Sequence, residues 1–223
     1  MAEYLRDTLR IMQAGTPQAF PPPAGVTGTR AALYNAFMAV DADMQNPAYR
    51  VPRDSVLTEG ATAAFVHVRQ SEDGKRFLYA ANVGDVEAVL GRRGATQVLT
   101  TKHSLQTAEG RAEAAANGGV ISNVRGEYVL NETGRFLRAF GQGRHKPFGG
   151  QRGCTAAPSM TSVEIDADCD FVVIASEGFW QHIVHERAVA MGELFWRVRA
   201  VPPLAPQTHH CPTSVNHSLR NGG

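Results

Sequence analysis

The sequence predicts an α+β fold in which antiparallel sheet is covered by helices, and two patterns carry this prediction. Apolar side chains recur at helical spacing as Leu33, Phe37, Val40 and Met44. From residue 60 onward the pattern changes to short strand-like runs that are separated by glycine-containing turns. Helical segments return between and after these runs, which favours layers of sheet and helix within one fold.

The N-terminal part of the chain predicts two helices separated by a loop. Residues 2–13 place apolar side chains on one helical face. These side chains are Leu5, Leu9 and Met12. Pro21-Pro22-Pro23 interrupts helical structure, because the proline ring fixes φ and removes the backbone donor. Thr29 is the expected N-cap of the second helix.

The middle of the chain predicts a series of short antiparallel strands. The expected strands are residues 61–68, 77–83, 86–90, 96–99, 120–124, 127–130, 162–165 and 171–175. Turn sequences separate three pairs of them, at Asp73-Gly74, residues 91–94 and Arg125-Gly126. The last run is continuously apolar, so we expect residues 171–175 to be buried on both faces of a sheet.

Two further helices are expected in the second half of the chain. Residues 105–117 are alanine-rich and end at Gly118-Gly119, and residues 186–198 follow the last strand. The apolar positions of the second of these helices are Val189, Leu194, Phe195 and Val198. We expect residues 1–200 to form one domain. Residues 201–223 lose periodicity and gain Pro, His, Ser and Asn, so we expect a disordered tail there.

The composition is that of a soluble globular protein with a formal net charge of +1. This charge gives no reason to expect a nucleic acid or a membrane surface as partner. The start of the chain mixes acidic and basic residues, unlike a signal peptide, and no run approaches the ~20 apolar residues of a transmembrane helix. Cys154, Cys169 and Cys211 do not have the spacing of a disulfide framework, so we expect the cytoplasm or another reducing compartment.

Five short motifs follow one another along the chain. They are Asn82-Val83-Gly84-Asp85, Leu99-Thr100-Thr101-Lys102-His103, Gly118-Gly119, Arg138-Ala139-Phe140-Gly141 and Ala175-Ser176-Glu177-Gly178-Phe179-Trp180. This ordered series resembles the metal-dependent PPM (PP2C-type) serine/threonine protein phosphatases. The resemblance implies an α-β-β-α sandwich, in which two antiparallel sheets pack together and helices cover the outside.

The resemblance also implies a cofactor and a reaction. Members of the family hold two Mn or Mg ions in a cluster of carboxylates, and hard divalent ions prefer such oxygen ligands. A water bound to the metal attacks the phosphoryl group, while the ions orient and stabilise the phosphate oxygens. The implied substrate is a phosphoserine- or phosphothreonine-containing protein, and no protein nucleophile is needed.

Several positions depart from the family pattern. Lys102, Gln142 and Gln181 stand where the family has Asp, and Glu177 replaces a metal-binding Asp. The sequence contains no Asp-Gly-His-Gly-Gly element and no counterpart of the family's closing Asp-Asn strand, so we expect a sandwich that lacks terminal strands. Asp85 and Glu177 remain as the candidate metal ligands, and no catalytic residue is assigned.

Each candidate also has a structural interpretation. Asp85 can accept backbone hydrogen bonds in its turn, and Glu177 can favour the start of the helix that follows it. His103, as a lone histidine, indicates a structural polar role, and His209-His210-Cys211 lacks a second ligand pair at zinc spacing. A basic cluster is expected to be a solvated loop. Its members are Arg138, Arg144, His145 and Lys146.

The sequence leads to three ordered hypotheses for function. The first is a PPM-type phosphatase-like protein with impaired or absent catalysis, a pseudophosphatase, because most metal ligands are missing. The second is an active Mn- or Mg-dependent phosphatase. The third is a non-enzymatic scaffold that binds a regulatory protein partner. Because a sandwich without its terminal strands exposes sheet edges, self-association is a further expectation.

Overall fold

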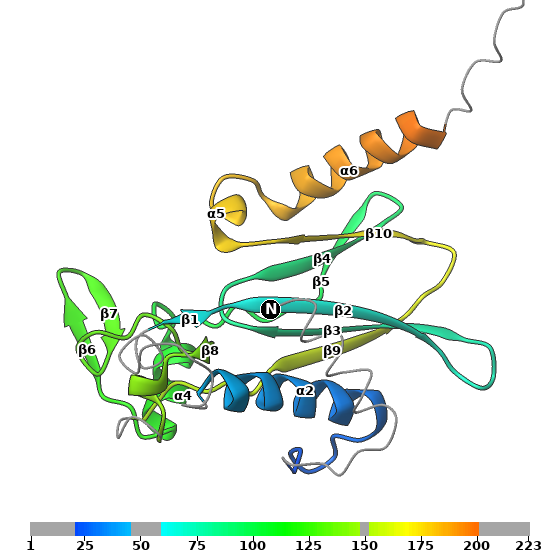
Figure 1. Ribbon diagram of the computed structural model, residues 1–223. Helices are drawn as coiled ribbons and strands as arrows, with labels where there is room; N and C mark the ends of the chain where they lie inside the picture. Colours follow the sequence, from blue (N-terminus) through cyan, green and yellow to red (C-terminus); the bar gives the residue numbers. More distant parts are fainter. Residues whose placement is uncertain (1–20, 46–58, 148–151, 201–223) are drawn as a thin grey trace, which may run out of the picture.

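The computed structural model describes residues 21–45, 59–147 and 152–200 (Figure 1). The helices are α2 (Gly28–Met44), α4 (Ala108–Ala116), α5 (Glu177–Trp180) and α6 (His185–Ala200), with a 3₁₀ turn η1 (Gly143–His145). The strands are β1 (Gly60–Ala61), β2 (Ala63–Gln70), β3 (Arg76–Val83), β4 (Glu87–Arg92), β5 (Ala95–Val98), β6 (Ile121–Val124), β7 (Glu127–Leu130), β8 (Phe140–Gly141), β9 (Ser159–Glu164) and β10 (Cys169–Ala175). The expected helix at 2–13 and the expected tail at 201–223 lie outside the described residues.

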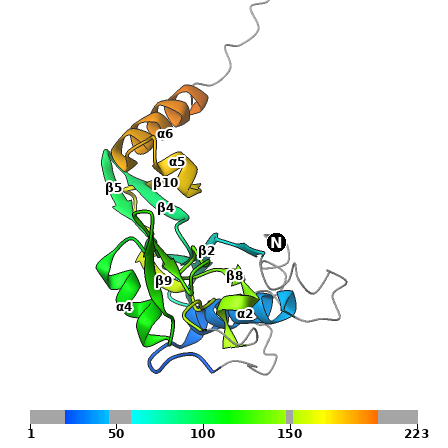
Figure 2. The same cartoon turned by 90° about the vertical axis from the view of Figure 1, so that its left-hand side faces the viewer.

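Two three-stranded antiparallel sheets form the centre of the molecule, with strand orders β2-β3-β9 and β10-β4-β5. Helix α2 lies on the outer side of the first sheet and α6 on the outer side of the second, and a view turned by 90° shows the same separation (Figures 1 and 2). Two small antiparallel pairs, β1-β8 and β6-β7, complete the described strands. The predicted α+β class and its α-β-β-α layering are therefore confirmed.

Strand β3 has buried side chains on both of its faces, toward the second sheet and toward α2. This is why it is the most apolar strand of its sheet. Leu78 and Ala80 are buried between the two sheets, and Ala81 and Val83 are buried against α2. Successive side chains of a strand point to opposite faces, so a strand covered on both sides must be apolar at almost every position. The layer under α2 also contains Phe37, whose ring lies 5.2 Å from that of Phe140.

Helix α2 confirms the apolar stripe, but its N-cap lies two residues before the expected one. Leu33, Phe37 and Val40 are fully buried, as the 3.6-residue period predicts. The N-cap is Thr27, and Thr29 lies inside the first turn. The Thr29 hydroxyl accepts a hydrogen bond of 2.8 Å from Arg69, so its role is to tie the helix to β2.

The expected hairpins form at the turns that the sequence indicated. Arg93 and Gly94 both have positive φ, and so do Arg125 and Gly126. Two successive residues with positive φ are typical of turns whose twist matches that of the flanking strands. Strand β4 continues through Gly91 to Arg92, so its turn is shorter than the sequence alone indicated.

The second sheet and its helix are less buried than expected. Strand β10 lies at the edge of its sheet and Ile174 is 47% exposed, so the expectation of burial on both faces is wrong. Of the apolar positions expected on α6, Val189 is buried, whereas Leu194 and Phe195 are exposed. Helix α4 starts at Ala108 rather than at residue 105, because the Thr107 side chain caps it. Within the described ranges, no helix has the apolar length that crossing a bilayer requires.

Candidate functional site

The pairing of β4 with β10 brings the two candidate ligands to one corner of the second sheet. The strands are antiparallel, and Glu87 at the start of β4 is opposite Ala175 at the end of β10. Asp85 stands two residues before Glu87, and Glu177 stands two residues after Ala175. Residues far apart in sequence therefore meet where one strand begins and the other ends.

A third segment, residues 99–103, completes this corner. The backbone N–H of Leu99 donates to the Ala88 carbonyl (2.9 Å), and that of His103 donates to the Gly84 carbonyl (3.0 Å). The segment thus runs beside the start of β4 and carries Lys102 to the two carboxyl groups. Lys102 Nζ lies 3.3 Å from Glu177 Oε1. We call Asp85, Glu177 and Lys102 the acid corner.

The turn that carries Asp85 depends on the glycine before it. Gly84 has φ +89°, a conformation that residues with a side chain rarely adopt. A Cβ at this position would lie 2.2 Å from Thr62 Cγ2, which is far inside van der Waals contact. Any side chain here would displace the turn, so the glycine fixes where the Asp85 carboxyl group is presented.

Asn82 and His103 fix the backbone segments that carry Lys102 and Asp85. The Asn82 amide bonds both backbone groups of Thr101: Nδ2 donates to the carbonyl (2.8 Å), and Oδ1 accepts from the N–H (3.2 Å). The Gly84 N–H donates to His103 Nδ1 (3.1 Å), and His103 Nε2 lies 2.8 Å from Ser159 Oγ. Burial lowers the pKa of His103 to about 4, with a further contribution from the charge of Arg138, so the imidazole is neutral at pH 7. The expected structural role of His103 agrees with these contacts.

The two carboxyl groups of the acid corner interact directly. Burial is the main cause that raises the pKa of Asp85, followed by a hydrogen bond with Glu177 and by the negative charge of Glu177. The pKa of Glu177 is lowered, first by the hydrogen bond with Asp85 and then by Lys102. The two shifts run in opposite directions, so Asp85 binds a proton more readily than Glu177, and Lys102 favours the charged form of Glu177.

With Lys102 bound to Glu177, this donor set does not fit a divalent metal ion. Mn²⁺ and Mg²⁺ take about six oxygen ligands. Two protein carboxyl groups meet here, and one of them is already ion-paired. Throughout residues 21–45, 59–147 and 152–200, no group of three or more His, Cys, Asp or Glu side chains is placed to hold a metal ion.

Trp180 anchors the short helix that begins with Glu177. Its indole Nε1 donates to the Ala175 carbonyl (3.0 Å), and its ring meets the ring of His185 edge-on at 4.8 Å. His185 Nε2 in turn lies 3.1 Å from Glu87 Oε2. These contacts link the end of β10, α5 and the start of α6, so they fix the backbone on which Glu177 stands.

The basic cluster is not the solvated loop that the sequence predicted. His145 and Lys146 are buried, and Lys146 Nζ binds Asp41 Oδ1 at 2.5 Å. Arg138 donates to Glu113 Oε1 at 2.7 Å, and of the four cluster residues Arg144 alone is exposed. Sequence reasoning missed Asp41, because no local pattern links this helical aspartate to a lysine more than a hundred residues later.

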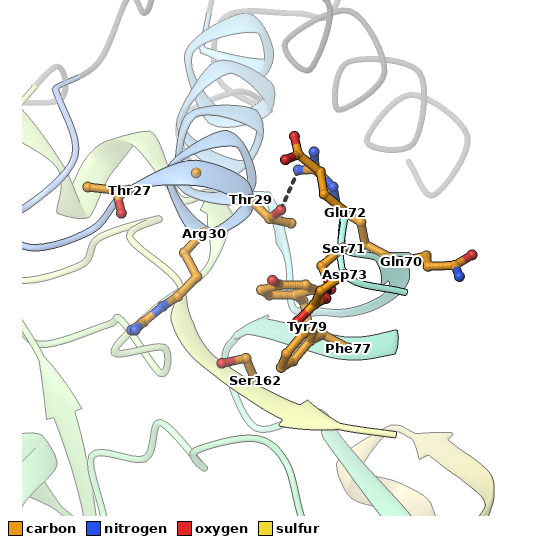
Figure 3. Close-up of a pocket in the computed structure, with 12 residues that line it drawn as sticks. Thr27, Thr29, Arg30, Gln70, Ser71, Glu72, Asp73, Phe77, Tyr79 and Ser162 are labelled. Atoms are coloured by element: carbon orange, nitrogen blue, oxygen red, sulfur yellow. Dashed lines mark hydrogen bonds between the residues drawn. The ribbon is translucent and has the colours of Figure 1, made fainter. Parts of the chain in front are cut away.

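A cavity of about 670 Å³ opens elsewhere, beside the start of α2 and the β2–β3 hairpin (Figure 3). Its lining combines arginine, acidic, hydroxyl and aromatic side chains. They are Thr27, Gly28, Thr29, Arg30, Arg69, Gln70, Ser71, Glu72, Asp73, Phe77, Tyr79 and Ser162. No residue of the acid corner lines it, and its opposite charges balance. We therefore place the candidate site at the acid corner, where two carboxyl groups and a lysine interact, and not in this cavity.

Comparisons with known proteins agree with the fold. A solved serine-threonine phosphatase 2C from Toxoplasma gondii matches with a TM-score of 0.66 and 13% identity, over 89% of this chain and 70% of that one. A solved sex determining protein from C. elegans matches with a TM-score of 0.65 and 19% identity, over 87% of this chain and 43% of that one. At such identities the likeness concerns the fold alone.

Sequence relatives carry the family assignment. The chain is 30% identical over 169 residues to Probable protein phosphatase 2C 74 of Oryza sativa subsp. japonica, which covers 75% of this chain and 38% of the relative. It is 34% identical over 145 residues to Protein phosphatase 2C-like domain-containing protein 1 of Homo sapiens, covering 65% of this chain and 22% of the relative. The chain thus spans less than half the length of these relatives. The family model of Protein phosphatase 2C matches residues 21–197. On this evidence, the chain belongs to the protein phosphatase 2C family.

Proposed function

We propose that this chain is a PP2C-type phosphatase-like protein whose metal-dependent catalysis is impaired as the chain stands. The observation that carries the proposal is the ion pair of Glu177. Its Oε1 lies 3.3 Å from Lys102 Nζ, so the carboxylate is occupied by the lysine and not available to a metal ion. The family is generally Mn- or Mg-dependent, so the loss of available ligands acts directly on its chemistry.

Asp85 and Glu177 are proposed as the remaining ligands for such an ion. Their placement at one corner by the β4–β10 register supports this role. Family membership implies phosphoprotein substrates, and we propose a phosphoserine- or phosphothreonine-containing protein as the molecule that this face recognises. The exact substrate class of the longer relatives does not transfer, because the chain covers 38% of the rice relative.

The test is hydrolysis of a phosphothreonine peptide and of a small aryl phosphate. Phosphate release is measured with excess Mn²⁺ or Mg²⁺ and with EDTA, and the matched control is Glu177→Gln, which keeps the size of the side chain and removes its charge. We expect the same background rate in all conditions. A metal-dependent rate that Glu177→Gln abolishes would instead establish the second hypothesis, an active phosphatase.

A non-enzymatic binding role is favoured by a different observation, the outer face of α6. Met191 and Leu194, three residues apart on α6, are more than half exposed, and so is Val184 just before the helix. Exposed apolar side chains grouped in this way are typical of contact surfaces. Sedimentation of the chain and of a Met191→Glu/Leu194→Glu variant tests self-association through this face. A concentration-dependent dimer that the variant abolishes supports this role, and a monomer at all concentrations argues against self-association.

A further inference from the structure

Three separate segments meet at the acid corner, and they bring opposite charges together. Asp85 comes from the β3–β4 turn, Lys102 from the segment after β5, and Glu177 from the start of α5, two residues after β10 ends. The lysine stands within the motif where the resemblance places an aspartate, so a cation replaces an anion at a position that contacts Glu177.

We propose that the Lys102 ammonium is the built-in cation of the Asp85–Glu177 pair and competes with a divalent metal ion for these carboxyl groups. The inference rests on the proposed function in one respect, the assignment of Asp85 and Glu177 as metal ligands. Beyond that function, it assigns to Lys102 the role of keeping this pair free of metal. Within the residues that the structure describes, no other lysine or arginine forms an ion pair with Glu177.

The backbone around Lys102 is fixed, and this favours the intramolecular cation. The Thr101 N–H donates to Asn82 Oδ1 at 3.2 Å, and the His103 N–H donates to the Gly84 carbonyl at 3.0 Å. Lys102 is therefore anchored on both sides, beside the turn that carries Asp85. A tethered group has an effective concentration in the millimolar range when its tether matches the distance. A metal ion must outcompete this ammonium before it reaches Glu177.

The competition follows from shared acceptors. A lysine ammonium donates hydrogen bonds to carboxylate oxygens, and a divalent ion coordinates through the same lone pairs. One cation therefore excludes the other from Glu177 Oε1. Removing the ammonium frees one ligand oxygen and removes a repelling positive charge, and replacing the lysine by aspartate also adds a third carboxylate.

The experiment measures Mn²⁺ binding by calorimetry on the full chain and four variants. Lys102→Met keeps the side-chain length without the charge, and Lys102→Asp restores the residue type of the family motif. Lys75→Met is the matched control, because Lys75 forms an exposed ion pair at the same distance, 3.3 Å from Glu164 Oε1. Lys102→Met/Glu177→Gln shows whether any added binding uses this corner.

We expect Lys102→Met to bind Mn²⁺ about tenfold more tightly than the unmodified chain and Lys102→Asp about a hundredfold more tightly. Lys75→Met should equal the unmodified chain, and the double variant should lose the gain. Equal affinities of Lys102→Met and the unmodified chain would overturn the inference, and so would a lack of Mn²⁺ binding by every variant. The phosphatase assay tests the proposed function separately. An unmodified chain that hydrolyses phosphopeptides would refute impaired catalysis. Tighter Mn²⁺ binding by Lys102→Met would still support competition between Lys102 and the metal ion.

Discussion

Lys146 and Asp41 form an ion pair in which the two side chains are 5% and 8% exposed, whereas Lys102 and Glu177 form one in which they are 43% and 38% exposed. The buried pair has further partners. Asp41 accepts from the Gly141 N–H at 2.8 Å, and Lys146 donates to the Ala139 carbonyl at 2.7 Å. The exposed pair has solvent around it. The same two functional groups therefore serve as a structural link in one place and as an accessible site in the other.

The difference shows that burial, and not the type of ion pair, decides what each lysine does. A buried charge must be compensated completely, because water no longer solvates it. Burial raises the pKa of Asp41 although Lys146, Gly141 and Gln45 all oppose that shift. An exposed pair is screened and can exchange partners at low cost. The Lys102–Glu177 pair can accordingly exchange partners, and the Asp41–Lys146 pair cannot.

The largest expected effect is on the buried pair. Lys146→Met leaves Asp41 buried without its cation, so we expect the free energy of unfolding to fall by about 3–5 kcal/mol. Urea denaturation measures this change, with Lys75→Met as the exposed control. If Lys146→Met does not fold, the Lys146→Met/Asp41→Asn variant should recover part of the stability because it removes the uncompensated charge. A loss below about 1 kcal/mol would remove the contrast between the two pairs.

An intermediate effect is expected for His103, which is buried and follows Lys102 directly in the sequence. Its pKa is about 4 in the folded protein and about 6.5 in the unfolded chain, so the unfolded chain binds the proton first as pH falls. Stability should therefore decrease between about pH 6.5 and pH 4, by about 3 kcal/mol at the lower limit. Denaturation midpoints across this range, compared with those of His103→Gln, isolate the contribution. Equal pH slopes for both proteins would contradict a neutral imidazole beside Arg138.

The smallest expected effect is on the exposed pair itself. Lys102→Met should change the free energy of unfolding by about 0–1 kcal/mol when measured in EDTA, because solvent screens the interaction with Glu177. The change should shrink further at high salt. Denaturation at low and high ionic strength checks both statements. A loss as large as that of Lys146→Met would show that Lys102 is a structural residue and that the two pairs are alike.

Local sequence signals predicted the hairpins and the first described helix well. Arg125-Gly126 and the Asp73-Gly74 turn specify their own geometry, since glycine adopts positive φ without steric cost. The apolar stripe of α2 is likewise complete within its own segment, and Leu33 and Phe37 are buried as the period requires.

Features that depend on distant segments were not predictable in the same way. The continuous apolar run at 171–175 is compatible with a central or an edge strand, and the order β10-β4-β5 is what decides between them. Lys146 is buried because Asp41 meets it, which no local pattern indicates. In the acid corner, the resemblance pointed to Asp85 and Glu177 as candidate ligands, but the interaction of Lys102 with Glu177 depends on how three separate segments are placed in the fold.

The register in which Glu87 faces Ala175 also has a kinetic meaning. Strands β4 and β5 form a local hairpin, whereas β10 joins them only after a long stretch of intervening chain has closed. Closing such a loop lowers the entropy of the chain before the new strand contacts stabilise it, so pairings of this kind slow folding. The acid corner is consequently absent from any partly folded chain in which β10 has not yet docked. A spectroscopic probe at Glu177 would therefore report the completion of the second sheet.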